Sequence, residues 1–156
     1  MAIVYVDMDN VIVDFKHALR ELGLPEDMKD ADNIDGIFSK MIPMPGAISG
    51  YKKLVDMGHD VYILSTAPWN NPSAWSDKLL WVQKYLGDVA YKRLILSHNK
   101  NLNSGDYLID DREHNGAGDW KKRGGLLRFG YDDVNGTTFD YPDWNAIIDF
   151  FQNLSE

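Results

Sequence analysis

The chain has 156 residues, of which 44% are hydrophobic and 26% are charged, so it is long enough for one hydrophobic core and too short for two ordinary domains. It contains no cysteine, which excludes disulfides, thiolate zinc sites and cysteine nucleophiles. The formal net charge of -8 argues against a partner such as polymeric nucleic acid, whose phosphates need neutralising, but not against a small phosphorylated ligand bound beside a metal ion. The first apolar run, residues 1–6, is too short for a signal peptide or a membrane span, and we expect a cytoplasmic protein without a membrane partner.

Short apolar runs rich in β-branched and aromatic residues recur along the chain and predict strands. Amphipathic segments with helical spacing separate them. Because parallel strands need crossover connections, this alternation predicts an α/β fold, a three-layer, Rossmann-like parallel sheet of about five strands flanked by helices. The strands are expected at residues 3–6, 61–64, 94–96, 107–109 and 126–129.

Three amphipathic helices are expected after Pro45. The first follows Pro45 and stops at Gly58, since glycine readily adopts the left-handed conformation found at helix ends. The second is expected to be capped by Ser73 and to end at Gly87, and the third to start behind Asp143 as its cap.

The stretch at about residues 16–45 does not follow this alternation. It contains a short helical pattern, then polar sequence typical of a loop, then a small apolar cluster. We interpret it as a small helical cap inserted after the first strand, lying over the site, within a single domain that spans residues 1–156.

Two carboxylates, Asp7 and Asp9, follow the first predicted strand in the sequence VYVDMDNVIVDF. Residues i and i+2 of an extended chain point the same way, so both side chains can face one ligand. Clustered carboxylates repel one another, and a bound cation is the first candidate to stabilise them. A nucleophilic carboxylate and a second one acting as general acid and base are sufficient to split a phosphoester through an aspartyl-phosphate. The alternative, that both residues only end the strand, stays open at this point, and Asp14 is expected only to start a helix.

Further polar residues follow the other predicted strands. Ser65 and Thr66 offer hydroxyl and backbone N–H groups, which can hold phosphate oxygens but more often form turns and caps. Asp110 and Asp111 are hard oxygen ligands that suit Mg²⁺, although a capped helix start would explain them too. Lys100 lies in a polar loop before them. Because ligands bind at the carboxyl ends of the strands in open α/β sheets, we expect these segments to converge on one rim.

The order of these motifs, DxD, then Ser/Thr, then Lys, then DD, resembles the haloacid dehalogenase superfamily of phosphohydrolases over nearly the whole chain. Asp7, Asp9 and Val11 match its first motif, DxDx(T/V), in the form typical of its phosphatases. The segments VDMDNVIVDF, MPGA, STAPW, WSDKLLWVQKYLG and LIDDR narrow the resemblance to the 5'(3')-deoxyribonucleotidases, which dephosphorylate nucleoside monophosphates.

This resemblance implies a role for each residue and Mg²⁺ as the cofactor. Asp7 would be the nucleophile and a metal ligand, and Asp9 would be the general acid and base and would offer its backbone carbonyl to the metal. Asp110 would supply a further carboxylate ligand, with Asp111 supporting the site from behind. The phosphoryl group would be bound by Ser65, Thr66, Lys100 and, from the aromatic-rich helix, Lys78.

The substrate pocket is the least specific part of the resemblance. Phe15 falls where the family packs an aromatic residue near the base, and a wall for base stacking could be completed by Phe38, Met41, Trp69 and Trp75, although each could equally be a core residue. Asn10 stands where many relatives have Gly, and Asn tolerates a positive φ better than most residues.

Other interpretations remain. The enzyme could act on another small phosphomonoester or on the 5'-phosphorylated end of a nucleic acid. A signalling receiver domain also combines an acidic Mg²⁺ pocket with a phosphorylated Asp, but there the acidic pair follows the first strand, whereas here the adjacent pair comes late. A binding protein on an inactive hydrolase fold is less supported, because every expected catalytic position is filled. The sequence leaves open whether the protein is a monomer or a homodimer.

Overall fold

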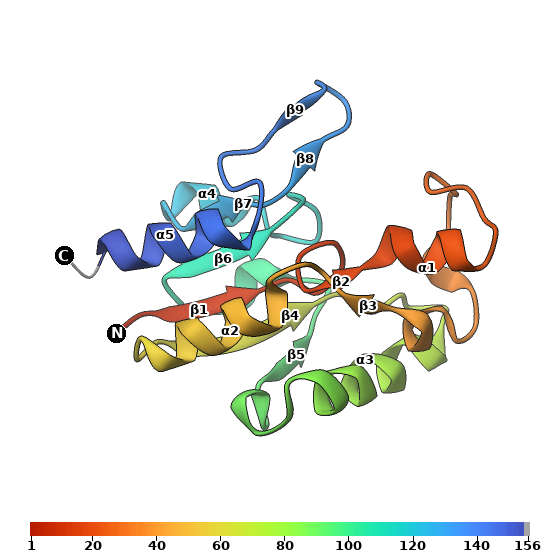
Figure 1. The fold of residues 1–156 in the computed structure, drawn as a ribbon, viewed down its shortest axis with the longest axis horizontal. Helices are drawn as coiled ribbons and strands as arrows, with labels where there is room; N and C mark the ends of the chain where they lie inside the picture. Colours follow the sequence, from red (N-terminus) through yellow and green to blue (C-terminus); the bar gives the residue numbers. More distant parts are fainter. Residues whose placement is uncertain (155–156) are drawn as a thin grey trace.

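A parallel sheet of five strands forms the centre of the computed structural model, which describes residues 1–154 (Figure 1). The strands run in the order β5-β4-β1-β6-β7, and every neighbouring pair is parallel. Each predicted strand is present to within one residue at either end, which confirms the predicted α/β fold. The strands are β1 (Ile3–Val6), β4 (Asp60–Ser65), β5 (Leu94–Leu96), β6 (Tyr107–Asp110) and β7 (Leu126–Arg128).

The predicted helices are also present, and their glycine and aspartate boundary residues act as expected. Gly58 and Gly87, with φ of 93° and 57°, follow the ends of the first two helices. The side chain of Asp143 caps the last helix by accepting a hydrogen bond from the Ala146 N–H at 2.9 Å. These helices are α2 (Ala47–Asp56), α3 (Pro72–Tyr85) and α5 (Trp144–Leu154), and a short fourth one is α4 (Asp119–Lys122).

The start of α3 differs from the prediction. The helix begins at Pro72 with Asn71 at the capping position, so the expectation that Ser73 caps it was wrong. Proline is favoured in the first turn because it has no N–H to leave unpaired. The Ser73 hydroxyl instead donates to Asn71 Oδ1 at 2.6 Å and accepts from the Gly36 N–H at 2.9 Å, which ties α3 to the segment 15–43.

The helices cover both faces of the sheet and make three layers. Along β1, Val4 and Val6 belong to the core shared with α2 and α5, whereas Tyr5 points to the opposite face. There its ring meets Trp120 of α4 with centroids 5.5 Å apart. This alternation follows from the pleat of a strand, and it leaves β1, the central strand, covered on both faces.

A cap follows β1 and lies beyond the carboxyl ends of the strands (Figure 1). Its first helix starts at Asp14, whose Oδ1 accepts from the His17 N–H at 2.9 Å, as predicted. The chain enters and leaves the cap through two short strands that pair antiparallel. The division into a single domain with an insertion at about residues 16–45 stays a prediction. The cap elements are β2 (Val13–Asp14), α1 (Phe15–Glu21), the 3-10 turns η1 (Ala31–Asn33) and η2 (Ile37–Lys40), and β3 (Ile42–Pro43).

A small hairpin that the sequence patterns did not predict extends beyond β7 (Figure 1). Of the helices in residues 1–154, none has the length and apolar character needed to cross a membrane. The remaining elements are the hairpin strands β8 (Tyr131–Asp132) and β9 (Thr137–Thr138) and the 3-10 turns η3 (Gly87–Ala90) and η4 (Lys100–Leu102).

Candidate active site

The loop after β1 carries the two carboxylates of the first motif. Asp7 is buried, and its backbone N–H donates to the Ile109 carbonyl at 2.9 Å, which extends the pairing of β1 with β6 by one residue. The chain then folds back, because the N–H groups of Ile12 and Val13 both donate to the Met8 carbonyl at 2.9 Å. This tight turn keeps Asp9 beside Asp7 at the rim of the sheet.

Asn10 makes that turn with a left-handed backbone, at φ of 63°. Its N–H donates to the Val13 carbonyl at 2.8 Å, which closes the loop. Asparagine is one of the few residues other than glycine that adopt this conformation at low cost. The departure from the glycine common at this position therefore leaves the required backbone geometry intact.

Lys100 joins two carboxylates that come from different strands. Its Nζ lies 2.9 Å from Asp7 Oδ1 and 2.7 Å from Asp110 Oδ2, and all three side chains are buried. The backbone of Lys100 is fixed on both sides, since its N–H donates to the Asn115 carbonyl at 2.7 Å and its carbonyl accepts from Trp120 Nε1 at 3.1 Å. The structure thus brings together the first, third and fourth motifs.

Lys78 reaches the site from α3 and has no exposed surface. Its Nζ lies 3.2 Å from Asp9 Oδ1 and 2.7 Å from Ser65 Oγ. The same ammonium lies 4.4 Å from the centroid of the Phe38 ring, an arrangement that stabilises a cation. Lys78 therefore connects the first motif with the second.

The two hydroxyls of the second motif are used differently. Ser65, at the end of β4, is buried and accepts a hydrogen bond from Lys78. The Thr66 hydroxyl donates to the Ser97 carbonyl at 2.8 Å, and Thr66 lines a small cavity together with Asp7 and Lys100. Thr66 is thus the residue of this motif that borders open space beside the nucleophile candidate.

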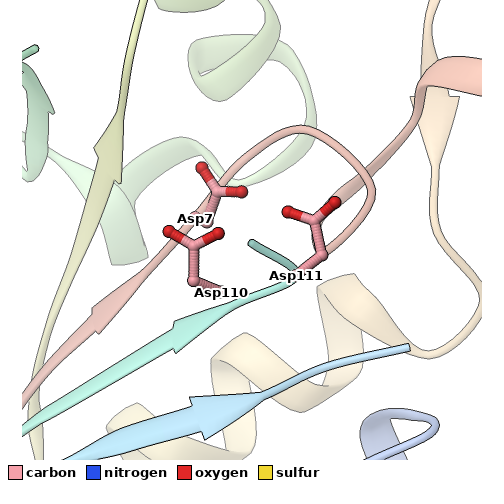
Figure 2. A group of neighbouring side chains, drawn as sticks. All are labelled: Asp7, Asp110 and Asp111. Carbon is pink, nitrogen blue, oxygen red and sulfur yellow. The ribbon is translucent and has the colours of Figure 1, made fainter. Parts of the chain in front are cut away.

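Three carboxylates form a cluster at the ends of β1 and β6. In Figure 2 the side chains of Asp7, Asp110 and Asp111 surround a common space, and one oxygen of each lies within 4.8 Å of the others. The sequence placed Asp111 behind the ligands, whereas here its carboxylate is a member of the cluster. Three carboxylates at this spacing are the donor set that a hard divalent cation such as Mg²⁺ or Ca²⁺ uses.

The electrostatics of the cluster favour a cation. Burial and the neighbouring Asp7 raise the pKa of Asp110 to about 7, and burial with both neighbours raises the pKa of Asp111. Burial also opposes ionisation of Asp7, but the Lys100 ammonium and hydrogen bonds hold its pKa below the usual value. Lys78 and Lys100 compensate only part of the negative charge of the site, so a divalent cation fits it in charge as well as in ligand type.

Two cavities meet at the site. Arg112, His114 and Asn115 complete the walls of the small cavity beside Asp7 and Lys100. Sequence reasoning assigned them no role, and the only signal was that they follow the Asp110-Asp111 pair in one loop. A larger cavity of about 400 Å³ lies under the cap and shares Asp9 and Arg112 with the small one. Its lining residues are Asp9, Asn10, Phe15, Met28, Asp30, Ala31, Asp32, Asp111 and Arg112.

Of the five residues expected in a base-stacking wall, only Phe15 lines the larger cavity. Phe38 and Met41 are buried in the core, because the cap packs them against α3. Trp69 is 78% exposed and packs edge-to-face with Trp75, away from the residues that line this cavity.

Comparison with known proteins identifies the family. A family model described as "5' nucleotidase, deoxy (Pyrimidine), cytosolic type C protein" matches residues 30–138. The chain belongs to this family. Its members are 5'-nucleotidases, which are phosphoric monoester hydrolases. The match begins after the first motif, so Asp7 and Asp9 lie outside the matched residues.

Several curated relatives are similar to this chain. A protein of the Vibrio phage KVP40, assigned as a 5'(3')-deoxyribonucleotidase, is 49% identical over 151 residues, which cover 95% of this chain and 83% of the relative. A protein of Bordetella bronchiseptica with the same assignment is 33% identical over 137 residues, covering 70% of this chain and 74% of its own. The human 5'(3')-deoxyribonucleotidase of cytosolic type is 30% identical over 79 residues, covering 50% of this chain and 39% of its own.

Solved structures with low sequence identity share the fold. A hydrolase from Pseudomonas syringae superimposes with a TM-score of 0.57 at 13% identity, covering 98% of this chain and 99% of that one. A haloacid dehalogenase family hydrolase from Deinococcus radiodurans, crystallised with phosphate and sodium, gives a TM-score of 0.53 at 14% identity, covering 95% and 86%. The chain therefore has the haloacid dehalogenase fold.

Proposed function

We propose that this protein is a Mg²⁺-dependent 5'(3')-deoxyribonucleotidase that releases phosphate from nucleoside monophosphates through an aspartyl-phosphate. The observation that carries the proposal is the position of Lys100, whose Nζ lies 2.9 Å from Asp7 and 2.7 Å from Asp110 at the edge of an acidic cluster. A cation between a nucleophile candidate and a metal-ligand candidate is the arrangement that phosphoryl transfer needs. The names of the relatives support the substrate class.

Asp7 is proposed as the nucleophile. Lys100 keeps its carboxylate ionised despite burial, which is the state that attacks phosphorus. Lys100 and the neighbouring Thr66 border the cavity into which the phosphoryl group would enter. Ser65 would contribute indirectly, by holding Lys78 against the site.

Asp9 is proposed as the general acid and base. Burial raises the pKa of its carboxyl group, while Lys78 opposes that rise, so the group holds a proton more readily than an exposed aspartate does. Asp9 would protonate the leaving oxygen of the sugar and later take a proton from the attacking water. It lines both cavities, so it stands between the phosphoryl position and the space for the leaving group.

Mg²⁺ is proposed as the cofactor because the residues present fit it. Asp7, Asp110 and Asp111 would hold the ion through their carboxylates, and the backbone carbonyl of Asp9 is the further ligand that the family resemblance suggests. A bound ion would supply positive charge next to the phosphoryl oxygens.

The charge of the larger cavity favours a mononucleotide over the 5'-phosphorylated end of a nucleic acid. It is lined by the carboxylates Asp9, Asp30, Asp32 and Asp111 against the single guanidinium of Arg112. A further phosphate, as in the 5' end of a nucleic acid chain, would meet repulsion there. The cytoplasm is the proposed location, because the family is described as cytosolic.

A panel of phosphomonoesters tests the proposal. Inorganic phosphate release should be measured from deoxynucleoside monophosphates, sugar phosphates and a 5'-phosphorylated oligonucleotide, with Mg²⁺ or EDTA, for the natural protein and for Asp7→Asn. We expect turnover of the mononucleotides that needs Mg²⁺ and that Asp7→Asn abolishes. Turnover of sugar phosphates alone would refute the nucleotidase assignment. A stable phosphoprotein formed from acetyl phosphate without turnover would instead support a receiver.

A further inference from the structure

The indole of Trp144 joins the last helix to the turn that carries Asp9. Trp144 is the first residue of α5 and is buried, and its Nε1 donates to the Val11 carbonyl at 2.8 Å. Val11 is buried as well and stands two residues after Asp9. The hydrogen bond therefore links the C-terminal helix directly to the loop of the first motif, 133 residues away in the sequence.

This contact completes the hydrogen bonding of the turn. The carbonyls of Met8 and Val13 accept from N–H groups within the turn itself. The Val11 carbonyl is paired outside the turn, with Trp144. Because a buried carbonyl needs a donor, loss of this N–H should make the turn shift towards another partner. Asp9 would move with it.

The neighbouring helix α2 makes room for this indole. Gly50 lies inside α2, where glycine weakens a helix, yet an ideal Cβ there would lie 2.4 Å from Trp144 Cε3. Any side chain at this position would therefore displace the ring. The ring also packs against Phe129, with centroids 6.0 Å apart. A phenylalanine would fill most of the same space, so the N–H is what tryptophan adds here.

Two further loops of the site are held in the same way. Trp75 Nε1 donates to the Pro68 carbonyl at 3.0 Å, in the loop after β4, and Trp120 Nε1 donates to the Lys100 carbonyl at 3.1 Å. Three of the five tryptophans thus donate to the backbone of a loop that carries candidate site residues. This recurrence indicates that the indoles do more than fill the core.

We propose that Trp144 is a positioning residue for catalysis, whose indole N–H holds the turn after β1 so that the carboxyl group of Asp9 faces the leaving oxygen. The inference rests on the proposed nucleotidase function and adds to it a residue that lines neither of the two cavities. Trp144 would act through the backbone of Val11 rather than on the substrate.

Two variants disturb this contact in different ways. Trp144→Phe keeps an aromatic ring but removes the N–H, whereas Gly50→Ala keeps the N–H but displaces the ring that bears it. Gly105→Ala is the matched control, because an ideal Cβ there would also lie 2.4 Å from a ring carbon, Cε2 of Tyr5. Gly105 precedes β6, at the end of the sheet away from the site.

The test measures kcat/KM for a deoxynucleoside monophosphate and for p-nitrophenyl phosphate, together with thermal unfolding. This parameter covers the reaction up to the departure of the leaving group. The sugar oxygen needs a proton to leave, whereas p-nitrophenolate leaves without one. A misplaced Asp9 therefore slows the nucleotide more than p-nitrophenyl phosphate, and a loss of folded protein slows both equally.

We expect Trp144→Phe and Gly50→Ala to lower kcat/KM about tenfold for the nucleotide and less than about twofold for p-nitrophenyl phosphate. Gly105→Ala should lower the Tm and leave the ratio of the two kcat/KM values unchanged. Gly50→Ala decides by itself if Trp144→Phe does not fold.

An equal loss on both substrates, or no loss, in a folded variant would overturn the inference while leaving the nucleotidase function in place. A change of the ratio in Gly105→Ala as large as in the other two variants would overturn it too, since the effect would not be specific to the turn. If the natural protein hydrolyses p-nitrophenyl phosphate but no nucleotide, the proposed function itself is wrong, and the role of Trp144 in it falls as well.

Discussion

Lys78 and Asp9 form an ion pair that joins helix α3 to the loop after β1, with Nζ 3.2 Å from Oδ1. The lysine side chain is completely buried, whereas the aspartate side chain keeps 28% of its surface exposed. A buried ammonium needs a partner, because leaving it unpaired is costly. The pair therefore fixes the carboxylate that we propose as acid and base without closing it off from a substrate.

Replacing this lysine should change the pH dependence of catalysis. In Lys78→Met the burial that raises the pKa of Asp9 is no longer opposed by the ammonium, so Asp9 keeps the proton that it donates to higher pH, and the basic limb of the kcat/KM profile should move to higher pH. We expect the maximum of kcat/KM to fall by about 10- to 100-fold, because the ammonium no longer positions the carboxyl group. The profile should be measured on a deoxynucleoside monophosphate, whose leaving oxygen needs the proton, alongside circular dichroism to verify folding.

Lys84→Met is the matched control, since Lys84 is exposed on the same helix. It should leave the profile where it is. A shift of equal size in both variants, or an unmoved profile in Lys78→Met, would contradict a specific effect on Asp9.

The left-handed residue Asn10 should tolerate glycine and reject a β-branched residue. Asn10→Gly keeps φ of 63° accessible and should change the free energy of unfolding by no more than about 0.5 kcal/mol. Asn10→Val should lower it by about 1–2 kcal/mol, because its Cβ branch clashes in that conformation. Urea denaturation of the three proteins measures both values. Equal stability of the glycine and valine variants would show that the turn relaxes out of the left-handed region.

The carboxylate cluster should make the metal-free protein less stable as the pH rises. The pKa of Asp110 is raised to about 7 in the folded protein, so the folded state holds a proton that the unfolded state has lost. The stability from this group is complete below its ordinary pKa of 3.8 and is lost as the pH rises through about 7.

Thermal unfolding in EDTA at several pH values between 4 and 8 measures this effect as the difference between the natural protein and Asp110→Asn. The Asp110→Asn variant should not show this loss of stability as the pH rises. Added Mg²⁺ should raise the Tm of the natural protein at pH 8 and have much less effect on the variant. A variant that gains as much from Mg²⁺ as the natural protein would remove Asp110 from the metal site.

His59, at the other end of the sheet, should make the protein less stable as the pH falls. Its Nδ1 accepts from the Ala2 N–H at 3.1 Å, and its Nε2 is buried and has no hydrogen-bond partner within residues 1–154. Burial lowers the pKa of His59, with the N-terminal charge adding to the effect. Because the folded state resists protonation, stability is complete above the ordinary pKa of 6.5 and is lost as the pH falls below it.

His59→Gln should flatten the stability profile between pH 5 and 7 while keeping an acceptor for the Ala2 N–H. Urea denaturation at pH 7.5 and 5.5 gives the comparison. A profile that is as steep in the variant as in the natural protein would assign the acid sensitivity to other groups.

The sequence predicted the sheet well because burial is periodic along it. The apolar runs at residues 3–6 and 107–109 reveal β1 and β6, and in a parallel sheet the polar residues that follow such runs must lie at one rim. That rule alone brings Asp7 and Asp110 together. The residues at the carboxyl end of each strand could thus be predicted without knowing how the helices pack.

Contacts that depend on how the helices and the cap pack could not be predicted from the sequence in this way. The position of Lys78 depends on the rotation of α3, and only the family resemblance suggested it. Phe38 looked equally suited to a base or to the core, and the packing of η2 against α3 placed it under Lys78. Asp111 was expected behind the ligands from the family resemblance, and it lies just past β6 with its carboxylate beside those of Asp7 and Asp110.

The stem formed by β2 and β3 has a consequence for how such proteins diversify. Val13 pairs with Pro43 and Asp14 with Ile42, so the chain returns to the sheet beside the point where it left. The residues between them can be lengthened, shortened or exchanged without moving Asp7 or the strands that hold it. We therefore expect relatives with different substrates to differ mainly in the cap, while the strands that carry Asp7 and Asp110 stay the same.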